Sequence, residues 1–173
     1  MNEGVVFFAF AAFVMLLFFA VTLPVVIFIN RQIGKSYDEN ARLVFAQIPM
    51  EGILFAEDDV AMRLSSVAFL AVGIRWGRAD VRVTQRGLYI AQWRKTWFGR
   101  MGQPVILIAL TPFGLDPSVA ARGSPMQVAG QPTFDGRAFE LPLTRSIARH
   151  RLHLEPRAGA AFAAVVERVM YPR

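Results

Sequence analysis

The sequence predicts one N-terminal transmembrane helix, then a mainly β domain that a C-terminal α-helix closes. Three observations predict this class. Residues 5–29 are an uninterrupted apolar run, residues 66–155 contain short strand-like stretches separated by turn residues, and residues 158–171 have apolar side chains at helical spacing. The chain has 173 residues and no cysteine, which excludes a fold held by disulfides.

The apolar run is long enough to cross a membrane. No charge occurs between Glu3 and Arg31, and only Thr22 and Pro24 interrupt the hydrophobic residues of 5–29. A helix of this length extends ~37 Å, against about 30 Å for the hydrocarbon core of a bilayer. A cleaved signal peptide is the competing interpretation, but the N-terminus lacks basic residues and no small-residue cleavage site follows. We therefore expect a retained anchor.

Flanking charges predict the orientation of this anchor. Arg31 and Lys35 follow the apolar run, whereas residues 1–4, a short N-terminal tail, contain no basic residue. The positive-inside rule then places the N-terminus outside and the C-terminal domain in the cytoplasm. Pro24 is expected to kink the helix, because proline removes one backbone hydrogen bond.

The predicted membrane helix contains no ionisable residue and therefore offers no ion site or proton relay. Its phenylalanines have two interpretations: they face lipid, or they pack against another protein's helices or flat cofactors. The residues predicted to pack are Phe7, Phe8, Phe13, Phe18 and Phe19.

Residues 30–65 are expected to form a helical linker. Ser36 and Glu39 have the spacing of a capping box, which predicts a short helix over 37–47 that ends before Pro49. The acidic run 57–59 fits either the start of a second short helix or a solvated loop. It lacks the alternate ligand spacing of a calcium loop, so no metal site is expected there.

The mainly β domain is expected to span residues 66–173. Residues 67–76 are apolar and partly β-branched, and 81–84 and 88–91 form a hairpin around a glycine-containing turn. Further strands are expected at 104–110, 126–129, 134–143 (with a turn at 135–136) and 150–155. A helix over 158–171 would then pack its apolar face on the sheet.

The expected order is about seven strands followed by one helix, and the 83–90 hairpin contains a Thr-Gln-Arg-Gly-Leu turn. In both features the chain resembles bacterial membrane-anchored proteins with a pleckstrin-homology-like (PH-like) domain. The resemblance covers about residues 66–171. It implies a half-open barrel or sandwich, closed at one end by the last helix, with a binding or scaffolding role and no named ligand. It also implies a single-pass protein of the bacterial inner membrane. The helical segment before the first strand departs from the family pattern.

Residues 75–100 carry seven basic residues and one acidic residue, a net charge equal to the +6 of the whole chain, together with all three tryptophans. This window suits anionic lipid headgroups or a protein partner. A third interpretation is a solvated surface that reflects an arginine-rich composition. No nucleic-acid partner is expected. The residues expected to contact partner or lipid are Trp93, Arg94, Lys95, Trp97, Phe98 and Arg100, on a loop after a strand. Trp93 has a second interpretation, as a core residue of that strand.

No catalytic, cofactor or metal residue is expected. The chain has no phosphate-binding glycine loop or nucleophile elbow. His150 and His153, three apart on a strand, would point to opposite faces. We therefore expect a non-catalytic accessory or scaffold subunit that stabilises a larger membrane complex, such as a photosynthetic or respiratory assembly. Its expected partners are integral membrane proteins and anionic lipids. The alternatives are a lipid-headgroup-binding PH-like module and an enzyme with an unrecognised site.

Overall fold

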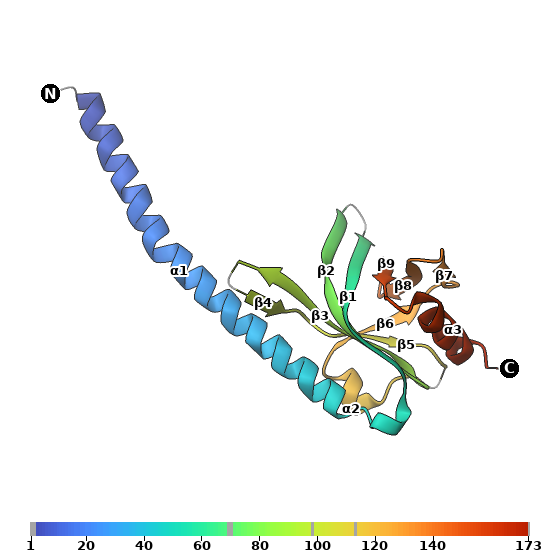
Figure 1. Ribbon diagram of the computed structural model, residues 1–173. Helices are drawn as coiled ribbons and strands as arrows, with labels where there is room; N and C mark the ends of the chain where they lie inside the picture. The colour runs from blue at the N-terminus through green and yellow to red at the C-terminus, as the bar shows by residue number, and fades with distance from the viewer. Residues whose placement is uncertain (1–2, 69–70, 98, 113, 173) are drawn as a thin grey trace.

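The computed structural model describes the chain in four stretches, residues 3–68, 71–97, 99–112 and 114–172. A long helix, α1 (Glu3–Ala46), leads into a β-barrel, and α3 (Gly159–Met170) follows the last strand (Figure 1). The predicted class, an N-terminal apolar helix followed by a mainly β domain and a C-terminal helix, is confirmed.

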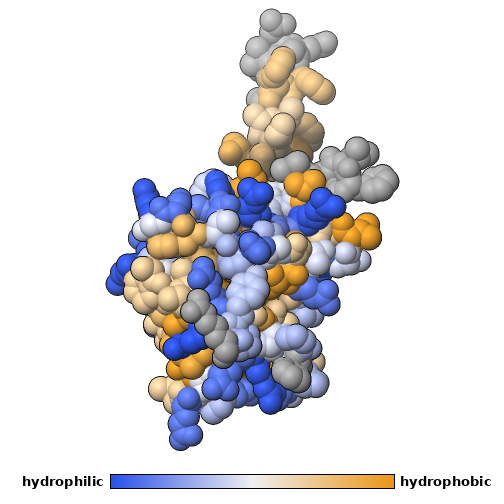
Figure 2. All heavy atoms as spheres, turned by 90° about the vertical axis from the view of Figure 1, so that its right-hand side faces the viewer, coloured by the Kyte–Doolittle hydropathy of each residue, from blue (hydrophilic) through white to orange (hydrophobic). Residues whose placement is uncertain are grey.

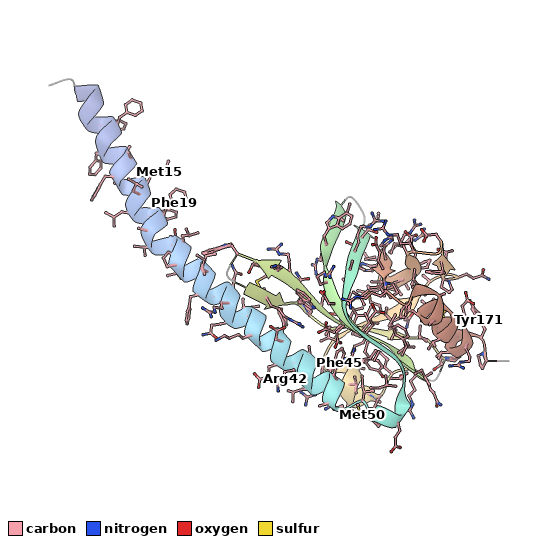
Figure 3. The ribbon with its side chains drawn as sticks, in the orientation of Figure 1. Met15, Phe19, Arg42, Phe45, Met50 and Tyr171 are labelled. Carbon is pink, nitrogen blue, oxygen red and sulfur yellow. The ribbon has the colours of Figure 1, made fainter. Side chains whose placement is uncertain are left out.

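Helix α1 is continuous over 44 residues and passes through Pro24 without a break. Its axis changes direction in its N-terminal half (Figure 1). Figure 3 shows Met15 and Phe19 projecting from the part that lies clear of the barrel. Residues 37–46 are helical, as predicted, but they continue α1 and do not form a separate helix. Ser36 lies inside α1, where the carbonyls of residues 32–35 are already available as helical partners, so no cap is needed.

The described residues contain nine strands, which form one sheet. They are β1 (Ile53–Ala68), β2 (Ala71–Thr84), β3 (Gly87–Thr96), β4 (Gly99–Gly102), β5 (Ile106–Ala109), β6 (Ser124–Val128), β7 (Thr133–Phe134), β8 (Phe139–Arg145) and β9 (Ala148–Glu155). The short helices η1 (Met50–Gly52) and α2 (Pro117–Ala120) lie in the connections.

Seven strands close into a ring in the order β1, β2, β3, β5, β6, β8, β9 and back to β1. Neighbours in the ring are antiparallel except β5 and β6, whose connection contains α2. Strand β4 pairs with β3, and β7 pairs with β8, both outside the ring. Of the predicted alternatives, the barrel is therefore found and the sandwich is not.

The prediction of a helical linker over 30–65 was wrong for the second half of this segment, because β1 begins at Ile53. The acidic run lies in this strand, where Arg78 and Arg82 of the paired strand β2 neutralise Asp59 and Asp58. The strand expected over 67–76 was also wrong: Val67 pairs with Val72 across the β1–β2 hairpin. The other predicted strands and the C-terminal helix are present.

The barrel interior is one hydrophobic core, to which every strand of the ring contributes. Helix α3 contributes Phe162, Ala163 and Val166 to it. The ring of Phe162 is fully buried and makes edge-to-face contacts with Phe55 and Phe139, at centroid distances of 5.2 and 4.9 Å. The amphipathic spacing of this helix thus fills the barrel, as expected from its sequence.

A second hydrophobic core lies outside the barrel, where the C-terminal end of α1 and α2 cover β3 and β5. Ala41 and Val44 of α1, together with Ile48 just after the end of this helix, supply one side of this core. The remaining buried members are Tyr89, Ala91, Val105, Leu107 and Val119. The apolar N-terminal part of α1 and the barrel are therefore joined by a packed helix.

Two glycines allow α1 to approach β4. A Cβ on Gly102 would lie 2.6 Å from Oδ1 of Asp38 and 2.7 Å from the carbonyl oxygen of Gly34. A Cβ on Gly34 would lie 2.7 Å from Cγ of Met101. Backbone meets backbone at Gly102, so the helix itself would have to move to admit a side chain.

Gly102→Ala should therefore lower the free energy of unfolding by about 1–3 kcal/mol, the usual effect of overpacking. Gly52→Ala is the matched control, because its Cβ would have an ordinary 3.5 Å contact with Pro49. Denaturant unfolding of the full chain in detergent measures both. Equal stability of the two variants would contradict a tight contact between α1 and β4.

Candidate functional site

The segment 93–100, expected to be a loop, is a β-hairpin, so that prediction was wrong. Strand β3 continues to Thr96, which pairs with Gly99 of β4, and Lys95 pairs with Arg100. Gly99 has a φ of +113°, a conformation that favours glycine and allows the tight turn. The hairpin lies beside α1 (Figure 1).

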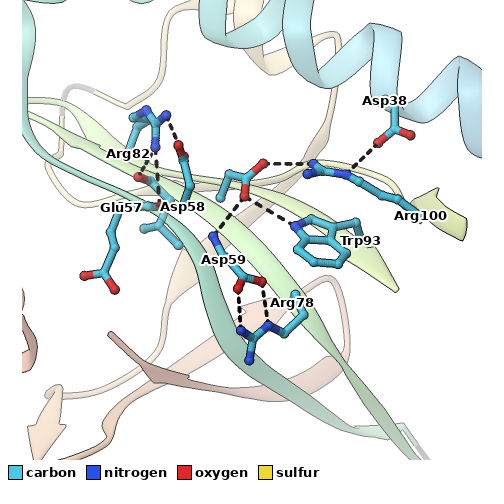
Figure 4. Close-up of polar contacts among 10 residues, drawn as sticks. Asp38, Glu57, Asp58, Asp59, Arg78, Arg82, Trp93 and Arg100 are labelled. Carbon is cyan, nitrogen blue, oxygen red and sulfur yellow. Dashed lines mark hydrogen bonds and ion pairs between the residues drawn. The ribbon is translucent and has the colours of Figure 1, made fainter. Parts of the chain in front are cut away.

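Two of the predicted contact residues, Trp93 and Arg100, hold this hairpin to the rest of the protein (Figure 4). The indole Nε1 of Trp93 donates to Oδ1 of Asp80 at 3.3 Å, and Nη2 of Arg100 donates to Oδ2 at 2.9 Å. Nε of Arg100 also lies 3.6 Å from Oδ1 of Asp38 on α1. The Arg100 guanidinium lies 4.6 Å from the Trp93 ring centroid. Both side chains are therefore committed to internal contacts.

Two further arginines of the basic window are neutralised by the acidic run of β1. Arg78 binds both carboxylate oxygens of Asp59, at 2.7 and 2.6 Å, and Arg82 lies 2.7 Å from Asp58. The hydrogen bonds from Arg78 lower the pKa of the Asp59 carboxyl. Asp59 has a φ of 60°, next to an irregularity in the β1–β2 register. The window is thus less positive than its sequence indicates.

The remaining predicted contact residues are exposed or lie outside the described residues. Arg94 and Lys95 are exposed, and Trp97, near the hairpin tip, is 82% exposed. Phe98 lies outside the described residues. Within the described residues, neither Arg94 nor Lys95 has an ion pair.

A groove of about 580 Å³ lies between α1 and the strands β2, β3 and β4. It brings Arg94 together with Arg75 and Trp76 of β2, which were not among the residues singled out from the sequence. The only sequence signal for these two was their place in the basic window. Their approach to Arg94 depends on sheet pairing, which a local pattern does not reveal.

The phenylalanines predicted to pack in the membrane are all exposed on α1. Their exposed fractions range from 57 to 78% for Phe7, Phe8, Phe13, Phe18 and Phe19. None of the described side chains of the apolar run is buried. The helix thus presents an aromatic surface that the barrel does not cover.

The two histidines lie apart. His153 contacts Glu140 and Glu155 through its two ring nitrogens, at 3.1 and 3.3 Å. The ring nitrogens of His150 are shielded from solvent, and this desolvation lowers its pKa. Among the described residues, no group of three or more histidine, cysteine or acidic side chains is placed to hold a metal ion.

Comparison with protein-family models, curated proteins and solved structures finds no match. The resemblance to PH-like domains therefore stays a prediction. A barrel fold serves many functions, so the exposed surfaces of this protein say more about its function than the fold does.

The Arg78–Asp59 pair predicts a pH effect. The folded pKa of Asp59 lies below its unfolded value, so the pair stabilises the fold above about pH 4, and this contribution is lost as the pH falls through the folded pKa. Asp59→Asn keeps a residue that tolerates positive φ but removes the charge.

The unfolding midpoints of wild type and Asp59→Asn should differ at neutral pH and converge in acid. Glu167→Gln, on the exposed side of α3, serves as the charge control and should not show this convergence. If the unfolding midpoints of wild type and Asp59→Asn still differ at low pH, the Arg78–Asp59 pair is not the cause of the difference in stability.

Proposed function

We propose that this protein is a non-catalytic, single-pass subunit that stabilises a larger membrane protein complex. Helix α1 would lie in the bilayer beside the host, and the barrel would rest against the cytoplasmic face. The segment Phe10–Ala46 contains a window long and apolar enough to cross a membrane. The flanking Arg31 and Lys35 support the cytoplasmic placement of the barrel.

The packed continuation of α1 onto the barrel carries this proposal. A helix that ended in a flexible linker would only tether its domain near a membrane. Here the helix runs on into residues that are buried against β3 and β5, including Val44 with no exposed surface. A partner that contacts both the helix and the barrel would thus meet them in a fixed geometry, as a clamp or scaffold requires.

The aromatic surface of α1 supports contact with other helices. Within a bilayer, helix association depends on van der Waals packing, because lipid tails are as apolar as the side chains. Phe7 and Phe18 are eleven residues apart, about 20° from three full turns, and so share one face of α1. Phe8 and Phe19 have the same spacing on a neighbouring face. A photosynthetic or respiratory assembly is one host that such bulky aromatic faces would suit.

Extraction from native membranes in a gentle detergent tests this function. We expect the protein in a particle much larger than its own 19.3 kDa and micelle, together with integral membrane proteins identified by mass spectrometry. A chain that is extracted alone, as a monomer, would refute the proposal.

Paired variants then locate the contact face. Phe7→Leu with Phe18→Leu, and Phe8→Leu with Phe19→Leu, preserve an apolar helix but remove aromatic bulk from one face each. We expect one pair to release the companions at least several-fold more readily than the other. If both pairs behave as wild type, the phenylalanines contact lipid only.

A further inference from the structure

We propose that the groove between α1 and strands β2, β3 and β4 binds the phosphate headgroup of an anionic phospholipid in the bilayer that α1 crosses. The inference rests on the proposed membrane anchorage, but not on the identity of any host complex.

The contacts of α1 establish this end. Gly34, four residues past Asn30, meets Met101 and Gly102 of β4. Just beyond the C-terminal end of the helix, Ile48 lines a cavity with Thr84 and Arg86, at the β2–β3 turn. That turn is therefore the end of the barrel far from the apolar run, and the opposite ends of β2 and β3 lie near it.

The groove lies at the depth of lipid headgroups. The α1 residues that line it begin at Asn30, directly after the apolar run, and end at Tyr37. Seven residues of helix rise about 10 Å, and the headgroup layer extends about 5–8 Å beyond the hydrocarbon core. Most of the groove would thus lie beside the headgroups.

The groove opens because two hairpins separate. Strands β2 and β3 pair as far as Arg78 and Trp93. Beyond this pair, β2 continues beside β1, and β3 continues beside β4 (Figure 1). The space between the diverging hairpins and α1 is the groove.

The side chains around this opening match an anionic, interfacial ligand. Arg75 and Arg94 are exposed and have no ion pair among the described residues, unlike Arg78, Arg82 and Arg100. Guanidinium groups bind phosphate through paired hydrogen bonds. Ile74 and Trp76, 56 and 64% exposed, supply apolar walls, and tryptophan favours the membrane interface.

Exposed apolar side chains gather at the same end of the barrel. Of the seven large exposed hydrophobic residues that the described part of the chain places outside α1, five lie here: Val67, Ile74, Trp76, Trp97 and Ile147. Ile147 belongs to this end because the β8–β9 turn adjoins the β1–β2 hairpin, where Arg149 pairs with Val67. Figure 2 shows orange and blue atoms side by side along the rim below the projecting helix. Such a patch marks an interaction surface, and its members Ile74 and Trp76 share the groove with Ile33 of α1.

The experiment compares lipid retention by the full chain in nanodiscs of phosphatidylcholine mixed with phosphatidylglycerol. Native mass spectrometry after release into detergent should show that wild type keeps phosphatidylglycerol in preference to phosphatidylcholine. Arg75→Gln with Arg94→Gln should reduce this preference about 10- to 30-fold, the contribution of two basic residues at a membrane surface.

Arg86→Gln with Arg168→Gln is the matched control, because it removes the same charge from exposed positions at the far end of the barrel. This pair should retain the wild-type preference, and added inorganic phosphate should not displace the lipid. Equal lipid loss in both double variants, no preference in wild type, or displacement by inorganic phosphate would each overturn the headgroup site. A chain that does not enter nanodiscs at all would instead refute the anchorage.

A second measurement avoids any loss of charge. Brominated phosphatidylcholine should quench the fluorescence of the wild-type tryptophans, and Trp97→Phe and Trp76→Phe should each reduce the quenched fraction. Unchanged quenching in both variants would show that the rim stays away from the bilayer.

Discussion

The apolar contact between the C-terminal end of α1 and the outer face of β3 and β5 determines how the parts of this molecule are placed. Val44, Leu107 and their neighbours lose contact with water there, which stabilises a helix end that would otherwise fray. Gly34 and Gly102 bring the same helix close to β4. These contacts set how far along α1 the barrel lies from the apolar run, and how the barrel is oriented.

The ion pairs and hydrogen bonds along the barrel depend on the same placement of α1 against the strands. Asp80 accepts hydrogen bonds from the Asp59 amide, Trp93 and Arg100, and Arg100 also reaches Asp38 of α1. One carboxylate thus joins β1, β2 and the β3–β4 hairpin, and the hairpin in turn reaches the helix. Arg78, Arg82 and Arg100 are neutralised, whereas Arg75 and Arg94 have no ion pair among the described residues and line the groove at the end nearest the apolar run. The proposed lipid site follows from that distribution.

Local patterns predicted elements wherever local contacts decide the structure. The 81–91 hairpin, the buried strand near 106 and α3 depend on alternation, turn residues and helical spacing within a few positions. The helix or loop predicted at the acidic run 57–59 was wrong, because Asp58 and Asp59 pair with arginines about twenty residues away on β2. The capping motif at Ser36 failed because a helix already running through it makes a cap unnecessary.

An apolar helix long enough to span a membrane, a mainly β domain and a C-terminal helix can be predicted from the amino-acid sequence, since each is encoded by an apolar run or a hydrophobic periodicity within one segment. The basic, tryptophan-rich window is visible in the sequence as well. Which residues of this window make internal contacts, and which stay exposed, follows from the folded structure. The pairing of β1 with β2 and the docking of α1 on the barrel join residues far apart in the chain, and such long-range contacts leave no local pattern to detect.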